Sequence, residues 1–351
     1  MLVYSFMALL SCFFAFLANK VSGKKSKIML FVLVFLPLFC VSAFRYNVGQ
    51  DYVNTYVYTF NRILHGVSNV RIDYGFFLLN KIIIIFGGSY QWVFILSSLI
   101  INYFICKSIY NQSKDKFLSV FIYIFGTLFF FTLNGVRQSM ALALFYYSLK
   151  YIENSKMKEY FFINFIGFLF HNSAIIFFPL YFIIGNKFNL KYKILIIVFM
   201  SILLPTLLPI LSNILLNTKY SMYLTNGAYN PLSTINVSII INILLFVYYE
   251  IILKKKGDND KKLNIYSNIH FIGIIVSFFT TKISLAMRIF MYFRYIEFLS
   301  VPFAIEKTSI AKGYKTIFKL LIICIYILYF IHGVYMENGN NVLPYNSCFF
   351  K

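Results

Sequence analysis

The chain of 351 residues is 60% hydrophobic, 21% aromatic and only 12% charged. Water-soluble domains carry about 25% charged residues, and apolar runs near the length needed to cross a bilayer recur here from end to end. The longest polar connections are about thirty residues, so no room is left for a soluble catalytic domain. The composition predicts one all-α domain over residues 1–351, a polytopic transmembrane helical bundle with about 10–12 membrane segments, some broken or re-entrant.

The net charge of +21 does not indicate nucleic-acid binding. Lysines gather in short loops between apolar runs, which the positive-inside rule assigns to the cytoplasmic side, and no aromatic-basic RNA-binding pattern is present. These basic loops are 19–27, 107–116, 150–158, 254–262 and 306–319. The apolar runs between and around them are 2–18, 28–44, 76–86, 92–106, 117–133, 138–151, 160–184, 192–216, 234–253, 264–280, 285–304 and 319–333.

This order of runs and loops predicts a topology. The N-terminus lies outside, and the run 76–86 is a half-helix because it is too short to span. The outer face then carries a segment over 45–75, a loop over 217–233 and the C-terminal tail 334–351.

The outer segment opens with charged and tyrosine-rich sequence where the chain leaves the bilayer. Read as an interfacial helix, Tyr52 and Tyr56 share one face. An aromatic belt anchor explains the tyrosines, but it requires neither Arg45 nor Asp51. These two charged residues are therefore candidate substrate contacts.

The stretch NGVRQSMALALFYY begins at Asn134 and places Arg137 where an outer turn becomes a membrane helix. Snorkelling to the surface would explain an arginine there, although an outer position runs against the positive-inside bias. Arg137 and the neighbouring Gln138 together predict a polar site at the outer end of this helix, above a packed apolar face.

The run 160–184 is interrupted by HNS at 171–173 and contains Pro179, so we expect a re-entrant or split segment over 160–185. The tract with Pro205 and Pro209 is the alternative place for the chain to turn back. A lone histidine on an apolar face is most often a hydrogen-bonded core residue. The alternative for His171 is a proton acceptor, because histidine titrates near neutrality.

One predicted crossing near the C-terminal end carries two arginines. Arg294 and Glu297 have i, i+3 spacing and can pair on one helix. Arg288 has no such partner on its own helix, and it forms a polar-aromatic stripe with Tyr292 and Tyr295. An intramembrane arginine that faces a cavity is a functional candidate by default.

Several motifs of known chemistry are missing from the sequence. It has no P-loop, HExxH, GxSxG or Cys/His cluster, so neither a metal nor a cofactor is expected. The DND at 258–260 lies in a lysine-rich loop, where solvated charge is the simpler interpretation. Four of the five cysteines lie in apolar runs, which argues against a disulfide framework.

Five stretches in chain order resemble the pattern of the EpsG family, the Wzy-like polysaccharide polymerases of bacterial capsule, exopolysaccharide and O-antigen pathways. They are RYNVGQDYVNTYVYTF, DYGFFLLNKIIIIFGGSYQWVF, LNGVRQSMALALFYYSLKYI, FLFHNSAIIFFPLYFI and NNVLPYNSCFF. The resemblance runs over nearly the whole chain. It departs at Asp73, where the family often has a glutamate with a longer reach.

The resemblance implies an inverting, metal-independent glycosyltransferase of the bacterial cytoplasmic (inner) membrane, with its active site facing outside. Donor and acceptor would both be undecaprenyl-diphosphate-linked oligosaccharides, bound within the lipid bilayer, and a flippase and a chain-length regulator are candidate partners. A diphosphate leaving group needs cations, and the arginine fork matches phosphate oxygens. The candidate catalytic residues are then His171, Asp51 and Arg137. Candidates for diphosphate or substrate binding are Arg45, Arg288, Arg294, Gln138, Tyr52, Tyr292 and Asp73.

A lipid-linked oligosaccharide flippase or polysaccharide transporter is the alternative function, because it would need the same arginines and tyrosines. Transporters are expected to show a polar path through the membrane, often with paired repeats. Here the informative polar residues gather toward the outside and no repeat stands out. A ligase would share the donor and differ only in its acceptor.

Overall fold

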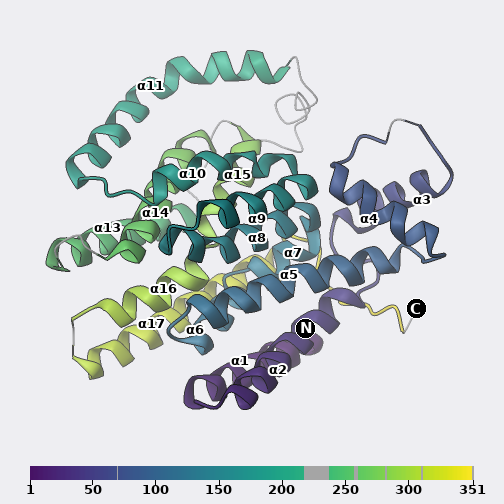
Figure 1. Ribbon diagram of the computed structural model, residues 1–351, viewed down its shortest axis with the longest axis horizontal. Helices are drawn as coiled ribbons and strands as arrows, with labels where there is room; N and C mark the ends of the chain where they lie inside the picture. Colours follow the sequence, from purple (N-terminus) through teal and green to yellow (C-terminus); the bar gives the residue numbers. More distant parts are fainter. Residues whose placement is uncertain (69, 217–236, 257–259, 281–282, 310, 350–351) are drawn as a thin grey trace. The chain divides into compact units, whose positions relative to one another are not determined.

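The computed structural model describes residues 1–68, 70–216, 237–256, 260–280, 283–309 and 311–349, and most of these are helical (Figure 1). In those ranges no β-strand forms, and a single antiparallel bridge joins Arg45 and Ser347. The predicted all-α class is therefore confirmed. The predicted outer loop 217–233 lies outside the described residues.

The chain divides into two compact units, Met1–Phe178 with Glu297–Lys351, and Pro179–Ile296. The first unit contains α1 (Leu2–Lys20), α2 (Lys24–Ala43), the π-helix η1 (Tyr52–Val57), α3 (Tyr58–Leu64), α4 (Tyr74–Ile85), α5 (Gln91–Gln112), α6 (Lys116–Phe125), α7 (Leu128–Asn134), α8 (Val136–Glu153), α9 (Met157–Phe170), the 3₁₀ turn η2 (Asn172–Ile176), α16 (Glu297–Lys307), α17 (Lys312–Phe330) and the π-helix η4 (Ile331–Met336). The helix α10 (Phe177–Ile184) leads into the second unit, which contains α11 (Leu190–Leu216), α13 (Val237–Lys256), α14 (Lys261–Thr280) and α15 (Ser284–Arg294).

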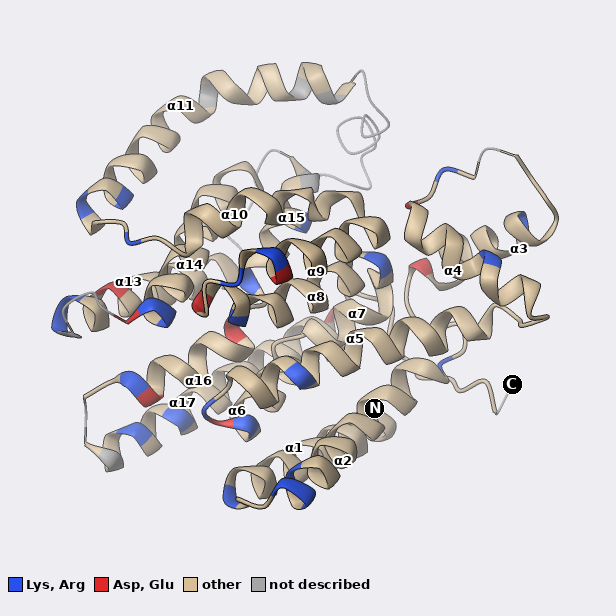
Figure 2. Cartoon of the chain, in the orientation of Figure 1, with Lys and Arg blue, Asp and Glu red and all other residues tan. Residues whose placement is uncertain are grey.

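Six of the described helices are long and apolar enough to cross a membrane, so the protein is a multi-pass membrane protein. They are Leu2–Lys20, Lys24–Ala43, Gln91–Gln112, Val237–Lys255, Lys261–Thr280 and Gly313–Met336. Figure 2 shows the lysines and arginines mainly at helix ends and connections, where charged side chains reach water most easily.

Two crossings that the sequence predicts as single helices are broken. The run 117–133 becomes α6 and α7, bent by 49° at Gly126 and Thr127, because Thr127 adopts a left-handed conformation with φ 69° that ends α6. The run 285–304 becomes two helices: α15 ends at Arg294, and α16 begins at Glu297. The expectation that Arg294 and Glu297 lie on one helix is therefore wrong.

Close helix contacts and interhelical hydrogen bonds hold the first unit together. A Cβ on Gly167 of α9 would lie 3.4 Å from the main chain of Ala141, so α8 and α9 approach closely. The buried Asn102 of α5 donates to Ser42 on α2 at 2.9 Å and accepts from Tyr123 on α6 at 3.1 Å. Such bonds position the helices where apolar contact alone would let them slide.

Candidate active site

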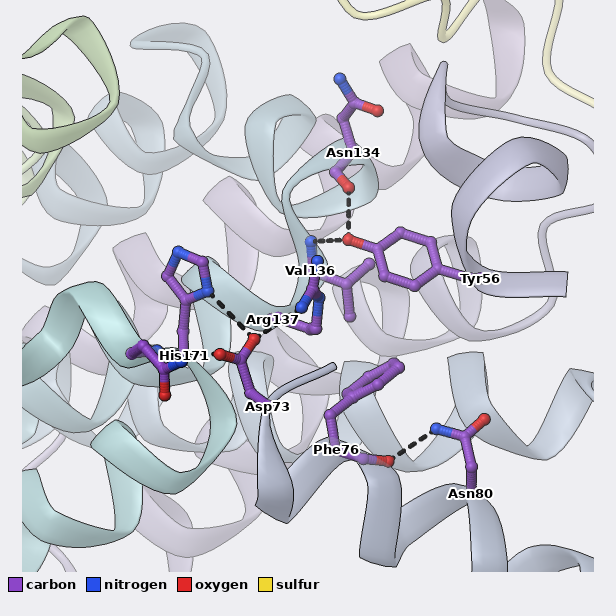
Figure 3. Close-up of polar contacts among 9 residues, drawn as sticks. Tyr56, Asp73, Phe76, Asn80, Asn134, Val136, Arg137 and His171 are labelled. Carbon is purple, nitrogen blue, oxygen red and sulfur yellow. Dashed lines mark hydrogen bonds and ion pairs between the residues drawn. The ribbon is translucent and has the colours of Figure 1, made fainter. Parts of the chain in front are cut away.

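Asp73 is the centre of an ionic cluster that joins three separate segments of the first unit (Figure 3). Arg137 donates from Nη1 to Oδ2 of Asp73 at 2.6 Å, and Nδ1 of His171 lies 3.4 Å from the same oxygen. The other oxygen, Oδ1, accepts from the main-chain N–H of Asn172 at 3.1 Å. The carboxylate is thus surrounded by donors from α8 and from the break after α9.

Asp73 stands at the start of α4, but its side chain does not cap that helix. It is the N-cap residue of α4, where an aspartate usually accepts from the first turn of the helix it begins. Its side chain makes no such bond. Gly75 lies two residues later, and a Cβ there would come within 2.9 Å of the Leu169 carbonyl. This close approach brings the start of α4 against the end of α9, next to His171.

Arg137 is the second residue of α8, where the helix dipole disfavours a positive charge. The carboxylate of Asp73 offsets that repulsion. The turn before Arg137 is held by Tyr56, whose hydroxyl donates to the carbonyl of Asn134 at 2.9 Å and accepts from the N–H of Val136 at 2.8 Å. The start of α8 is therefore fixed from the segment 45–75.

His171 lies at the predicted break in the chain. Its backbone is extended, with φ −154° and ψ 117°, between the end of α9 and the turn η2. With Asp73 ionised, we infer that Nδ1 carries the proton and donates to the carboxylate over a long hydrogen bond. Among the described residues, none forms a hydrogen bond with Nε2, so this nitrogen can accept a proton.

The electrostatics favour an ionised Asp73. Burial alone would raise the pKa of the carboxyl group, but the hydrogen bond from His171 and the charge of Arg137 outweigh it and lower the pKa below 3.8. The side chain of Asp73 is 6% exposed, whereas those of Arg137 and His171 are 26% and 23% exposed. The carboxylate is thus buried, and the side chains of its two partners are partly exposed.

Arg45 is not part of the Asp73 cluster, and its guanidinium is already hydrogen-bonded to main-chain carbonyls. It is 1% exposed, and its guanidinium donates to the carbonyls of Ser42 at 2.6 Å and Leu133 at 3.1 Å. It also lies 4.7 Å from the ring of Phe94, which stacks on Tyr52. Burial lowers the pKa of Arg45 to about 10, which still leaves it charged at neutral pH. Arg45 and Tyr52 thus connect the end of α2 to α5 and α7.

None of the remaining predicted site residues is among the described donors to Asp73. Asp51 is half-buried, and its main-chain N–H donates to the side chain of Asn134 at 2.9 Å, while Gln138 is buried in the first turn of α8. Arg288, Tyr292 and Arg294 belong to α15 in the second unit, with Arg288 exposed and the other two buried. The structure therefore brings together Asp73, Arg137 and His171 from the predicted set.

The sequence does not identify two residues that the structure makes important. An aromatic belt explains Tyr56 in sequence, yet its hydroxyl organises the turn that carries Arg137. Lys193 is not a candidate from the sequence, yet it is buried and pairs with Glu250 at 2.6 Å. Only the single glutamate in the apolar run 234–253 could have suggested such a partner. The described residues contain no group of three or more His, Cys, Asp or Glu that could hold a metal ion.

Comparison with known proteins gives one result. Searches among curated proteins and solved structures found no match. The model of the EpsG family matches residues 28–347, which include Asp73, Arg137, His171 and most of the C-terminal tail. Because this match covers nearly the whole chain, the protein belongs to the EpsG family.

Proposed function

We propose that the protein is a polysaccharide polymerase of the Wzy type. It would join undecaprenyl-diphosphate-linked repeat units at the outer face of the bacterial cytoplasmic membrane, in capsule, exopolysaccharide or O-antigen synthesis. The observation that carries this proposal is the cluster of Asp73, Arg137 and His171, in which a buried carboxylate contacts one partly exposed base and one partly exposed cation. Family membership supports the same reaction class.

His171 is the general base of the proposed reaction. An acceptor hydroxyl gives its proton to Nε2 as its oxygen forms a bond to the anomeric carbon of the donor sugar. Asp73 holds the proton on Nδ1 and stabilises the imidazolium that forms. Attack opposite the leaving group inverts the anomeric centre.

Arg137 stabilises the leaving group. The bond between the anomeric carbon and the diphosphate oxygen breaks, and its electron pair stays on the diphosphate. Nη1 of Arg137 donates to Asp73, and the guanidinium has further N–H donors that match phosphate oxygens. The partly exposed side chain allows that contact without a change in the carboxylate pair.

A gene deletion tests the reaction class. Loss of a polymerase should leave single repeat units on the lipid carrier at the outer face, whereas loss of a flippase should leave them at the inner face. His171→Asn and Arg137→Ala should reproduce the outer accumulation while the protein remains in the membrane. Full-length polymer from both variants would reject the proposed site.

A further inference from the structure

The C-terminal tail after η4, residues 337–349, is bound to the segment 44–50 along its length. In Figure 1 this tail, in yellow, runs beside the N-terminal helices. Four main-chain hydrogen bonds join the two: Tyr46 N–H to Asn346 O at 2.9 Å, Gly49 N–H to Asn341 O at 2.9 Å, Gln50 N–H to Asn340 O at 3.3 Å, and Cys348 N–H to Phe44 O at 2.8 Å. Chain ends usually fray unless they are tied down.

The tail has a defined shape of its own. Asn338 donates from Nδ2 to the carbonyl of Leu343 at 2.8 Å, and its Oδ1 accepts from the N–H groups of Val342 and Leu343 at 2.9 and 3.1 Å. Its backbone is left-handed, with φ 47°, a conformation that asparagine tolerates better than most residues. Tyr4 of α1 also donates to the carbonyl of Val342, at 2.9 Å.

The segment held by the tail leads directly to the candidate active site. A Cβ on Gly49 would come within 2.8 Å of the Leu133 carbonyl, so this part of the segment lies against the end of α7. The next contact is from the N–H of Asp51 to the side chain of Asn134. Asn134 and Val136 are then joined by the hydroxyl of Tyr56, and Arg137 follows.

We propose that the tail 337–349 positions Arg137 for the reaction by fixing residues 49–51, and through them the turn at 134–136. The role in the reaction rests on the proposed function. Asn338 is the positioning residue that shapes the tail, and Tyr56 is the positioning residue nearest Arg137. A displacement far from the reacting atoms can lower a rate by up to about 100-fold when it shifts a catalytic group by 1 Å.

Asn338→Gly in the full-length protein tests this role. Glycine accepts the left-handed backbone and removes all three side-chain hydrogen bonds, so the change acts on the tail without adding strain. We expect amide exchange at residues 49–51 and 134–137 to rise by about tenfold or more. We also expect kcat for polymerisation to fall by roughly tenfold, with KM within about twofold of wild type.

Two further variants complete the experiment. Asn346→Ala is the matched control in the same tail, because its exposed side chain forms no hydrogen bond with the described residues while the bond to its carbonyl is kept. It should behave as wild type. Asn338→Asp keeps the two accepted bonds and should recover most of the rate.

The outcomes separate this inference from the proposed function. If Asn338→Gly raises exchange at 49–51 but leaves exchange at 134–137 and kcat unchanged, the tail has no positioning role and the inference is overturned. If the wild-type protein makes no polymer, the proposed function fails. In that case the exchange result at 134–137 still decides whether the tail controls the turn before Arg137.

Discussion

The two units each contain an ionic cluster, and the clusters differ in what they leave accessible. In the first unit, Arg137 and His171 are about a quarter exposed around the buried Asp73. In the second unit, Lys193 donates to Glu250 at 2.6 Å and to Ser267 at 2.8 Å, and Ser267 donates to Glu250. There the side chains of Lys193 and Glu250 are 1% and 10% exposed.

This difference distinguishes a binding site from a connection between helices. Lys193, Glu250 and Ser267 come from α11, α13 and α14, and they satisfy one another inside the second unit. Charges paired this way are strongly destabilising when one partner is lost. The cluster at Asp73 differs, because only its carboxylate is buried and the side chains of Arg137 and His171 are partly exposed. The first cluster should therefore control rate, and the second should control stability.

The largest effect is expected from His171→Asn, which removes the proposed base and keeps the size of the side chain similar. The polymerisation rate should fall by roughly 10²–10⁴-fold, measured as kcat with purified protein in vesicles. Thermal stability should stay close to wild type because the side chain is partly exposed. His65→Asn, at an exposed position on the segment 45–75, is the control. A similar rate loss in both variants would remove the distinction between the two histidines.

Lys193→Met should have the opposite effect to His171→Asn: it should lower stability and leave the rate unchanged. It leaves Glu250 without its cation, so the free energy of unfolding should fall by about 3–5 kcal/mol, measured by denaturant titration in detergent. The rate per folded molecule should be unchanged. Lys191→Met, at an exposed position on the same helix, is the matched control.

A double variant sharpens this second test. Lys193→Met with Glu250→Met removes both charges, and it should recover most of the stability lost in the single variant. If the double variant is as unstable as the sum of the two single variants, the pair does not act as one unit. A loss of activity in folded Lys193→Met protein would show that both clusters serve the reaction.

Asp73→Asn should lower the rate by about 10–100-fold. The amide keeps the shape of the carboxylate but cannot hold the His171 proton or offset the charge of Arg137 in the same way. The effect should appear in kcat more than in KM. Asp115→Asn is the contrast, because Asp115 pairs with Lys319 at 2.8 Å outside the site and its loss should change stability alone. Equal rates for Asp73→Asn and wild type would exclude an orienting role.

The smallest effect is expected from pH. The folded-state pKa of Asp73 lies below its usual value of 3.8, so its contribution to stability is fully present above that pH and is lost as pH falls through the lower value. The difference in unfolding free energy between wild type and Asp73→Asn should shrink as the pH falls below about 4. A difference that stays the same below pH 4 would contradict this assignment.

Local sequence signals predicted the parts of the site that depend on neighbouring residues. Arg137 was placed at the start of a helix, and HNS at 171–173 marked irregular backbone. Both follow from charge and polarity set into apolar sequence. The break in the run 285–304 was not predicted, because neither glycine nor proline marks it.

Local sequence signals could not predict the long-range contacts of the site. Asp73 meets Arg137 and His171 across 64 and 98 residues, and nothing in its own stretch indicates which oxygens face which donors. Arg45 is a candidate substrate contact by sequence, whereas in the structure it is buried against carbonyls of Ser42 and Leu133. Burial depends on which helices come together, and hydropathy of a single run does not contain that information.

The glycine at position 75 has a consequence for how the site tolerates change. Since the Leu169 carbonyl fills the space that a methyl group would need, the spacing between Asp73 and His171 is set by two stretches of main chain. Repacking of nearby apolar side chains should therefore leave that spacing intact. A saturation screen of this region should find that even alanine is rejected at Gly75, whereas the exposed Tyr74 beside it accepts many replacements.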